Sequence, residues 1–330
     1  MTEPAVGLIA NPAAGKDIRR LVAPASTFDN SEKVRIVRRI LAGLAAMNIP
    51  SVAYLPDAYG IVERALAGME GLPLSCQPLP VPLQHTAEDT LAATQLLVAA
   101  GVRCIVTLGG DGTNRIVAKM CGSVPVVAVA TGTNNVFPTM VDGTLAGIAA
   151  GLVARGLASP VCIVPTPRLD VLVDGKLAEI ALVDVAISAH SFLGARAVWE
   201  PELLRELIVA QAAPGVIGLA SIGAHLAPGA TERGRGLHIV LGPGGLRVQA
   251  ILAPGLVRPV SVRHWQQLEP GDVVEITELP CTVAVDGERE LRVAAGQRLS
   301  VQLTMDGPRR VDIRSTLVDA AARGLLRVMP

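Results

Sequence analysis

The sequence predicts an α/β domain with a mainly parallel sheet, followed by a β-rich, sandwich-like C-terminal domain. In the first half, short apolar runs alternate with helical patterns, as in a parallel sheet covered by helices. After about residue 160, strand-like segments are separated by Gly, Pro and Asp-Gly, which is typical of antiparallel sheets. The chain has 330 residues, 50% of them hydrophobic, enough for a substantial core in two domains of ordinary size.

Each element of the first half has a signal in the sequence. Segment 31–48 gathers aliphatic residues on one helical face, namely Val34, Val37, Leu41 and Leu44. Segment 86–101 opens with a Thr-x-x-Asp capping pattern and ends in Gly, which predicts a helix start and stop. In chain order we expect strand 5–11, helix 31–48, strand 51–55, helix 57–69, helix 86–101, strand 103–109 and strand 124–132.

The second half is predicted to be mostly strands, with a helix at 201–211. Strands are expected within 168–188, 237–252, 273–277, 282–293, 298–305 and 309–315. We therefore divide the chain into an α/β domain over 1–159, a β-rich domain over 160–315, and a C-terminal helix over 316–330 that returns to the first domain.

Composition excludes several classes of function. The formal net charge is +0, from 29 basic and 29 acidic residues, and aromatic residues make up 2%. The chain thus lacks the basic patches and stacking side chains of nucleic-acid binders. The five cysteines form no C-x-x-C pair, which favours a reduced, cytoplasmic protein. No apolar run approaches the ~20 residues of a membrane-spanning helix, and the N-terminus shows no signal-peptide pattern.

Asp111 stands between glycines where strand 103–109 passes into a helix. Ligands bind at the carboxyl ends of parallel strands, and Gly109, Gly110 and Gly112 let a ligand approach the backbone closely. The N-terminus of the following helix suits phosphate. A carboxylate there would repel phosphate unless it holds Mg²⁺ or takes a proton from a hydroxyl, and both roles belong to phosphoryl transfer.

Two further loops place glycine and short polar residues at the same edge of the predicted sheet. The loop after strand 124–132 offers donors suited to ribose or phosphate, namely Thr131, Gly132, Thr133, Asn134 and Asn135. The loop after strand 5–11 offers Asn11, Gly15 and Lys16 to a phosphate, although its spacing is not that of a P-loop. Three such loops on one edge predict a nucleotide site in the first domain.

Two Asp-Gly pairs lie between strand-like flanks, at Asp174 and Asp286. Asp-Gly between strands is typical of a tight hairpin turn, and we expect one at Asp174. At Asp286, a turn and a functional role both stay open.

The motifs resemble those of the NAD kinase and diacylglycerol kinase superfamily. GGDGT at 109–113, NP-x-x-G at 11–15 and GTNN at 132–135 carry the resemblance. Within it, stretches 132–147 and 181–188 are most similar to the acetoin catabolism protein X group, which is ATP-NAD kinase-like. The resemblance covers nearly the whole chain and implies a NAD kinase-like fold.

The resemblance implies roles for these residues. Asp111 would activate the acceptor hydroxyl or organise Mg²⁺, which binds together with the nucleotide, so the implied cofactors are ATP and Mg²⁺. Binding of the donor phosphates and the nucleotide would fall to Asn11, Gly15, Lys16, Gly109, Gly110, Gly112, Thr113, Asn114 and the loop Thr131–Asn135. By analogy, the protein would assemble as a homodimer or homotetramer.

The sequence also departs from the NAD kinase pattern. Where NAD kinases carry an Asn-Glu pair, this chain reads Val183-Asp184, so only the acid is kept. The VDGE stretch at 285–288 is closer to the diacylglycerol kinase branch, in which an Asp-Gly-Glu lies near the active cleft. The candidate acceptor-site residues are therefore Asp184, Asp286 and Glu288.

Three functions fit these features. The first is an ATP-dependent kinase acting on a hydroxyl of a small soluble acceptor, with NAD⁺ as the leading candidate. The second is a lipid kinase of the diacylglycerol type. The third is a catalytically weak, nucleotide-binding regulatory protein of acetoin catabolism.

Overall fold

The first part of the molecule is a seven-stranded sheet in the order β3-β2-β1-β4-β5-β17-β6. The computed structural model describes residues 5–16, 29–189, 201–230 and 234–327. The strands are β1 (Val6–Ala10), β2 (Ser51–Tyr54), β3 (Ser75–Pro78), β4 (Cys104–Gly109), β5 (Val126–Ala130), β6 (Ile163–Pro165) and β17 (Arg309–Val311). All neighbours are parallel except β6 and β17, which confirms the predicted α/β fold.

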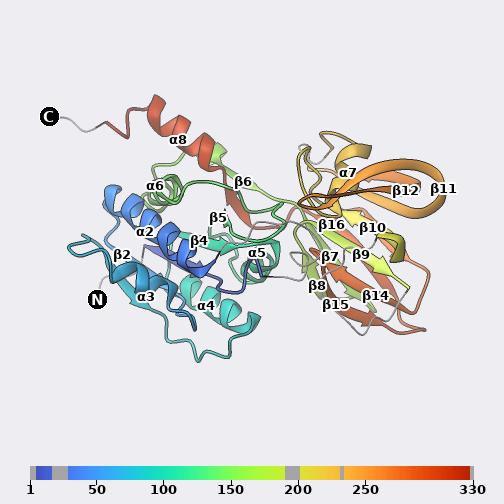
Figure 1. The fold of residues 1–330 in the computed structure, drawn as a ribbon, viewed down its shortest axis with the longest axis horizontal. Coiled ribbons are helices and arrows are strands. Elements are labelled where there is room, and N and C mark those ends of the chain that lie inside the picture. The colour runs from blue at the N-terminus through green and yellow to red at the C-terminus, as the bar shows by residue number, and fades with distance from the viewer. Residues whose placement is uncertain (1–4, 17–28, 190–200, 231–233, 328–330) are drawn as a thin grey trace.

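Helices cover both faces of this sheet (Figure 1). One face carries α2 (Asn30–Ala46), α3 (Ile61–Leu66), α6 (Gly143–Ala154) and α8 (Ile313–Ala322), and the other carries α4 (Ala87–Ala99) and α5 (Asp111–Ala118). Along β4, Val106 and Leu108 pack into the first layer and Ile105 into the second. The strands are almost wholly apolar because both faces are buried.

The α2 and α6 helices cross at very short range. A Cβ atom on Gly43 of α2 would lie 2.5 Å from the carbonyl oxygen of Thr144, and one on Gly147 of α6 would lie 2.2 Å from that of Ile40. The two backbones therefore touch, and at these two positions only glycine fits. The predicted apolar face of α2 is buried against the sheet and this neighbour.

The second part consists of two antiparallel sheets packed face to face, which confirms the predicted β-rich domain. Their orders are β12-β11-β10-β9-β14-β15 and β13-β16-β7-β8, and an apolar cluster that includes Val185, Val283 and Val301 lies between them. The strands are β7 (Arg168–Val173), β8 (Lys176–Ala181), β9 (Asp184–Ser188), β10 (Leu204–Val209), β11 (Gly236–Ala253), β12 (Leu256–Leu268), β13 (Val273–Ile276), β14 (Cys281–Val285), β15 (Glu288–Val293) and β16 (Leu299–Thr304).

Two predicted helices differ from the structure. The helix predicted over 57–69 is reduced to α3, because the Asp57 carboxylate accepts the N–H groups of Tyr59 and Ile61 and holds the preceding residues in a turn. The helix predicted over 201–211 is wrong. After a short 3-10 turn, Leu204–Val209 form β10, which pairs with β9 on one side and β11 on the other. Sheet pairing on both sides overrides an ambiguous apolar pattern.

After the second part, the chain returns to the first sheet. Arg310 of β17 is the residue that pairs with Val126 of β5, and β17 also pairs with β6. Segments 163–165 and 309–311, which lie inside the stretch 160–315, are therefore strands of the first sheet. The closing helix begins at Ile313 and is capped by the Asp312 carboxylate.

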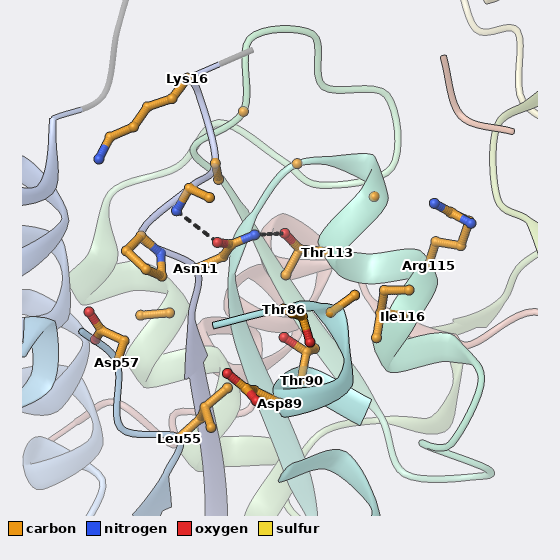
Figure 2. Close-up of a pocket in the computed structure, with 18 of the residues that line it drawn as sticks. Asn11, Lys16, Leu55, Asp57, Thr86, Asp89, Thr90, Thr113, Arg115 and Ile116 are labelled. Carbon is orange, nitrogen blue, oxygen red and sulfur yellow. Dashed lines mark hydrogen bonds between the residues drawn. The ribbon is translucent and has the colours of Figure 1, made fainter. Parts of the chain in front are cut away.

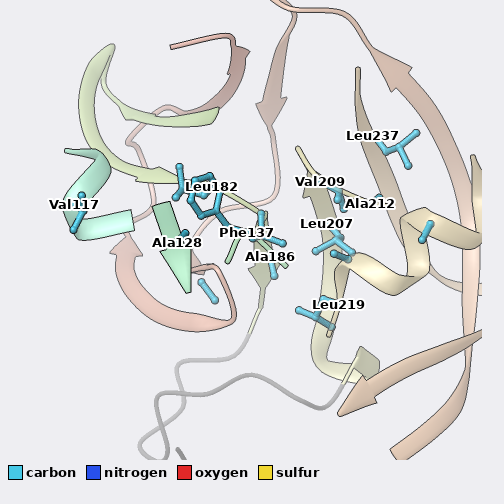
Figure 3. Close-up of a cluster of buried hydrophobic side chains, with 14 of the residues drawn as sticks. Val117, Ala128, Phe137, Leu182, Ala186, Leu207, Val209, Ala212, Leu219 and Leu237 are labelled. Carbon is cyan, nitrogen blue, oxygen red and sulfur yellow. The ribbon is translucent and has the colours of Figure 1, made fainter. Parts of the chain in front are cut away.

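One apolar cluster runs through both parts of the molecule (Figure 3). It joins Val117 and Ala128, in α5 and β5, to Ala186 and Leu207, in β9 and β10. Phe137 lies fully buried within it. The two parts therefore share a core.

Candidate functional site

The candidate site lies at the carboxyl ends of β1 and β4, where the order of the strands in the first sheet reverses direction. From β1 the chain continues to β2 on one side, while β4 lies on the other side of β1, and such switch points leave a crevice at the carboxyl ends of the strands. A cavity of about 1000 Å³ lies there, between loops of the first sheet and side chains of the second part. Figure 2 shows residues that line it from the loops of the first part and from the start of α4 and α5.

The loop after β1 is tied to the start of α5 by Asn11. Its side-chain Nδ2 donates to the hydroxyl of Thr113 at 2.9 Å, and its Oδ1 accepts the N–H of Ala13 at 2.8 Å (Figure 2). Gly15 has a φ of 76°, which favours glycine, and Lys16 lines the cavity. The structure thus brings together three residues predicted from this loop with Thr113 of GGDGT.

Asp111 joins the other two loops. It is the first residue of α5, and its carboxylate accepts the backbone N–H groups of Phe137 at 2.8 Å and Val136 at 3.1 Å. It also lines the cavity. Asp111 therefore fixes the loop after β5 against the first turn of α5, in addition to any contact with a ligand.

The glycines of these loops serve different purposes. A Cβ on Gly132 would lie 2.8 Å from the Cα of Gly110, and one on Gly109 would lie 2.4 Å from the side chain of Thr113. Gly132 thus lets the backbone pack on that of Gly110, and Gly109 leaves room for the Thr113 side chain. Gly112 is different, because a Cβ there would meet only the Glu288 carboxylate, at 3.8 Å, and the residue lines the cavity. At Gly112 the first turn of α5 thus has no side chain of its own between its backbone and the cavity, and the Glu288 carboxylate lies beside it.

Other predicted nucleotide-binding residues build the loops and are not among the residues lining this cavity. They are Gly109, Asn114, Thr131, Thr133 and Asn135. Asn114 accepts the Thr107 hydroxyl and donates to the carbonyl of Gly110. Asn135 closes its own loop through both backbone groups of Gly132.

Asn134 differs from its neighbours because it lines the cavity and reaches the second part of the molecule. Its Nδ2 donates to the carbonyl of Leu252 in β11 at 3.2 Å. The loop after β5 is therefore held from three sides, by Asp111, by its own Asn135 and by β11.

Asp286 combines the two alternatives that the sequence left open. Asp286 and Gly287 have φ values of 49° and 77° and form the turn between β14 and β15. The carboxylate of Asp286 accepts the N–H groups of Leu182 at 3.0 Å and Val183 at 2.8 Å, and it also lines the cavity. Burial raises the pKa of Asp286, while the nearby Arg115 opposes that rise.

The other two candidate acceptor residues lie in different surroundings. Glu288 lines the cavity, and its carboxylate lies close to Gly112, 3.8 Å from where a Cβ on that residue would be. Asp184 is buried in β9, its N–H points to the Asp286 carboxylate, and it is not among the lining residues. The structure therefore brings Glu288 and Asp286, but not Asp184, to the cavity.

The sequence analysis did not single out several charged residues that line the cavity. Arg115 of α5 and Lys119, which follows α5, both contact Glu179 of β8, at 3.3 Å and 2.8 Å, and Arg115 lies 3.6 Å from Asp286. This charged cluster crosses between the two parts of the molecule beside the cavity. No spacing in the sequence relates β8 to α5, so the pairing could not be read from the motifs.

Two acids on the β2 side of the cavity were also missed. Asp57 caps the turn before α3, and Asp89 accepts the N–H groups of Gln84 and His85 at 2.8 Å and 2.7 Å. Asp57 had a signal, since it follows strand 51–55 at the same edge as the predicted loops.

Within residues 5–16, 29–189, 201–230 and 234–327, no group of three or more His, Cys, Asp or Glu side chains could hold a metal ion. The five cysteines are free thiols, and burial raises the pKa of Cys104 to about 12, which makes a poor nucleophile. No helix in the same ranges is long and apolar enough to span a membrane.

Comparison with known families agrees with this geometry. Residues 6–157 match the ATP-NAD kinase N-terminal domain, and residues 167–306 match the acetoin catabolism protein X C-terminal domain. Fold and site thus define an ATP-NAD kinase-like protein. The chain is 38% identical to "Acetoin catabolism protein X" of Cupriavidus necator over 342 aligned positions, covering 99% of this chain and 95% of the relative. It therefore belongs to the acetoin catabolism protein X family, which confirms the resemblance seen in the motifs.

Solved structures with a similar trace include two of a putative diacylglycerol kinase from Bacillus anthracis str. Sterne. One has a TM-score of 0.48 and 13% identity, over 94% of this chain and 98% of that chain. The other has a TM-score of 0.43 and 15% identity, over 94% and 99%.

Proposed function

We propose that this protein is an ATP-dependent kinase that phosphorylates a hydroxyl group of a small soluble acceptor, with NAD⁺ as the leading candidate. The match to the ATP-NAD kinase N-terminal domain supports a kinase-type function. The observation that carries the proposal is the cavity at the carboxyl ends of β1 and β4. There the first turn of α5, at Gly112, lies beside the Glu288 carboxylate.

The residues present fit a nucleotide. The first turn of α5 lacks a side chain at Gly112, so its N–H groups can approach a phosphate, and Lys16 adds a positive charge at the cavity wall. Bound Mg²⁺ would neutralise charge on the donor phosphates. Asp111 holds the loop that carries Asn134, and we assign it a further role beside the acceptor hydroxyl or the metal.

The acceptor side is polar. The large apolar side chains that line the cavity are Leu55, Tyr59 and Ile116, whereas Glu179, Asp286 and Glu288 line it from the second part. A carboxylate facing an acceptor hydroxyl can orient it and take its proton, which is the role we assign to Glu288. This lining supports a soluble acceptor over a diacylglycerol-type lipid. The cytoplasmic location and the homodimer or homotetramer stay predictions.

The first test is NADP⁺ formation from ATP–Mg²⁺ and NAD⁺. We expect product from wild type and from Asp319→Asn, a matched change on α8 remote from the cavity. Asp111→Asn should lower turnover by about 10²-fold or more, with the fold kept. Activity retained by Asp111→Asn would contradict the assignment of Asp111.

Absence of product from wild type would have a separate meaning. If calorimetry then detects ATP or NAD⁺ binding, another acceptor or the regulatory alternative takes the place of the NAD kinase proposal. The next acceptors to screen would be hydroxylated metabolites, followed by lipids.

A further inference from the structure

Lys33 lies beneath the loop that forms one wall of the cavity. Its side chain is fully buried, and its Nζ donates to the carbonyl oxygens of Ala14 at 2.8 Å, Asn11 at 2.9 Å and Pro12 at 3.2 Å. The side chain of Asn30 is a fourth acceptor, at 3.2 Å. An ammonium group has three N–H donors, so three carbonyls of one short loop match its capacity.

Lys33 contacts this loop on the side that faces away from the cavity. The loop residues Ala10–Lys16 line the cavity, and Lys33 is not among the lining residues. The carbonyls of Asn11, Pro12 and Ala14 turn toward the buried ammonium, and so do not present their negative ends to a ligand in the cavity. Several N–H groups of the loop are bonded within the protein, namely those of Asn11, Ala13, Ala14 and Lys16. The loop therefore faces an anion with the Lys16 ammonium, while its carbonyl oxygens are drawn back.

We propose that Lys33 is a positioning residue that holds the Asn11–Gly15 loop in the shape that receives the phosphate groups of a nucleotide. The inference rests on the proposed function only as far as nucleotide binding, not phosphoryl transfer. Without the ammonium group, three partly buried carbonyls would lose this donor, and leaving such groups unpaired is costly. The loop would then rearrange, and the link from Asn11 to Thr113 would weaken with it.

Because of its lowered pKa, Lys33 should make nucleotide binding depend on pH. Burial, helped by the charge of Lys16, lowers the pKa of Lys33 to about 8, while Asp57 and Asp29 act in the opposite direction. The charged, loop-holding form therefore predominates at pH 7, falls to half near pH 8 and is lost as the pH rises further. Nucleotide phosphates finish ionising at about pH 6 to 7, so the ligand does not titrate in this window.

The experiment measures binding of ATP–Mg²⁺ by calorimetry at several pH values between 7 and 9. Binding of inorganic pyrophosphate is measured at pH 7 only, because pyrophosphate itself loses its last proton toward the upper end of this range. If only the charged form binds, wild-type affinity falls about tenfold over this range. Lys33→Met should bind about tenfold more weakly at pH 7 and show a flat profile. Lys176→Met, at an exposed site on β8, serves as the matched control and should follow wild type. The wild-type profile decides the question even where a variant folds poorly.

The outcomes separate this inference from the proposed function. Pyrophosphate affinity that is the same in wild type and Lys33→Met, or a flat wild-type profile, would overturn the role of Lys33 while leaving kinase activity possible. A Lys33-dependent profile without any phosphoryl transfer would support the role of Lys33 and count against the kinase proposal. Failure of wild type to bind either ligand would overturn both.

Discussion

At the scale of single residues, the polar side chains around the cavity are mostly committed to the protein itself. Four of these side chains form hydrogen bonds to backbone groups of nearby loops, namely those of Asp111, Asn135, Asp286 and Lys33. This leaves the backbone of the first turn of α5 and a few side chains, such as Lys16 and Glu288, to meet a ligand. Rigid loops of this kind reduce the entropy lost on binding.

Gly112 offers the most direct residue-scale prediction. A methyl group there would enter the space between the first turn of α5 and Glu288 without touching any atom closer than 3.8 Å. We expect Gly112→Ala to leave the free energy of unfolding unchanged or slightly higher, since alanine favours a helix over glycine. Nucleotide affinity should fall by about tenfold, measured by calorimetry. Unchanged affinity would show that the phosphates do not approach this turn.

The sequence located many of these residues because motifs are local. The glycines of GGDGT and the loop residues Asn11 and Asn134 lie at the cavity or support it. Lys33 could have been noticed, since it lies four residues before Val37 on a face that is otherwise apolar. The pairing of Arg115 with Glu179 could not, because it depends on how β8 packs against α5.

At the scale of elements, local patterns predicted strands and helices well where one periodicity prevailed. The helices α2 and α4 and the strands β1, β4 and β5 agree closely with expectation. The stretch 201–211 failed because its apolar residues fit either period, and only the flanking strands β9 and β11 decide between them. β12 was not predicted, since Arg258, Pro259 and Arg263 interrupt its apolar alternation.

At the crossing of α2 and α6, we predict that alanine destabilises the protein although it has a higher helix propensity than glycine. Gly147→Ala would gain about 1 kcal/mol from propensity, but its Cβ would lie 2.2 Å from the carbonyl oxygen of Ile40. We expect a net loss of about 1–3 kcal/mol in the free energy of unfolding, measured by denaturant titration. Gly112→Ala is the matched control, with the same chemical change where the nearest atom would lie at an ordinary contact distance of 3.8 Å. Equal stability of the two variants would mean that the helices separate at little cost.

At the scale of the whole molecule, the shared apolar cluster predicts a single unfolding unit. Phe137 is fully buried where the first sheet meets β9 and β10. Phe137→Ala should cost about 3–5 kcal/mol and should lower the midpoint of one common transition in calorimetry. A wild-type protein that unfolds in two separate steps would contradict a shared core.

Arg310 connects the same region to the C-terminal part of the chain. Its guanidinium donates to the carbonyl of Phe137 at 3.2 Å and lies over the Phe137 ring, and it belongs to β17. The loop that Asp111 holds from one side is thus held by the returning strand from the other. The sequence predicted a segment that returns, but not its place as a strand between β5 and β6.

The position of β17 has a consequence for folding of the protein during translation. Residues 309–311 leave the ribosome long after β5, so the edge of β5 around Val126 stays open while the second part is synthesised. An open strand edge on a nascent chain invites pairing with other chains. The first sheet can close only near the end of translation, and a fragment that stops before β17 would carry this exposed edge permanently.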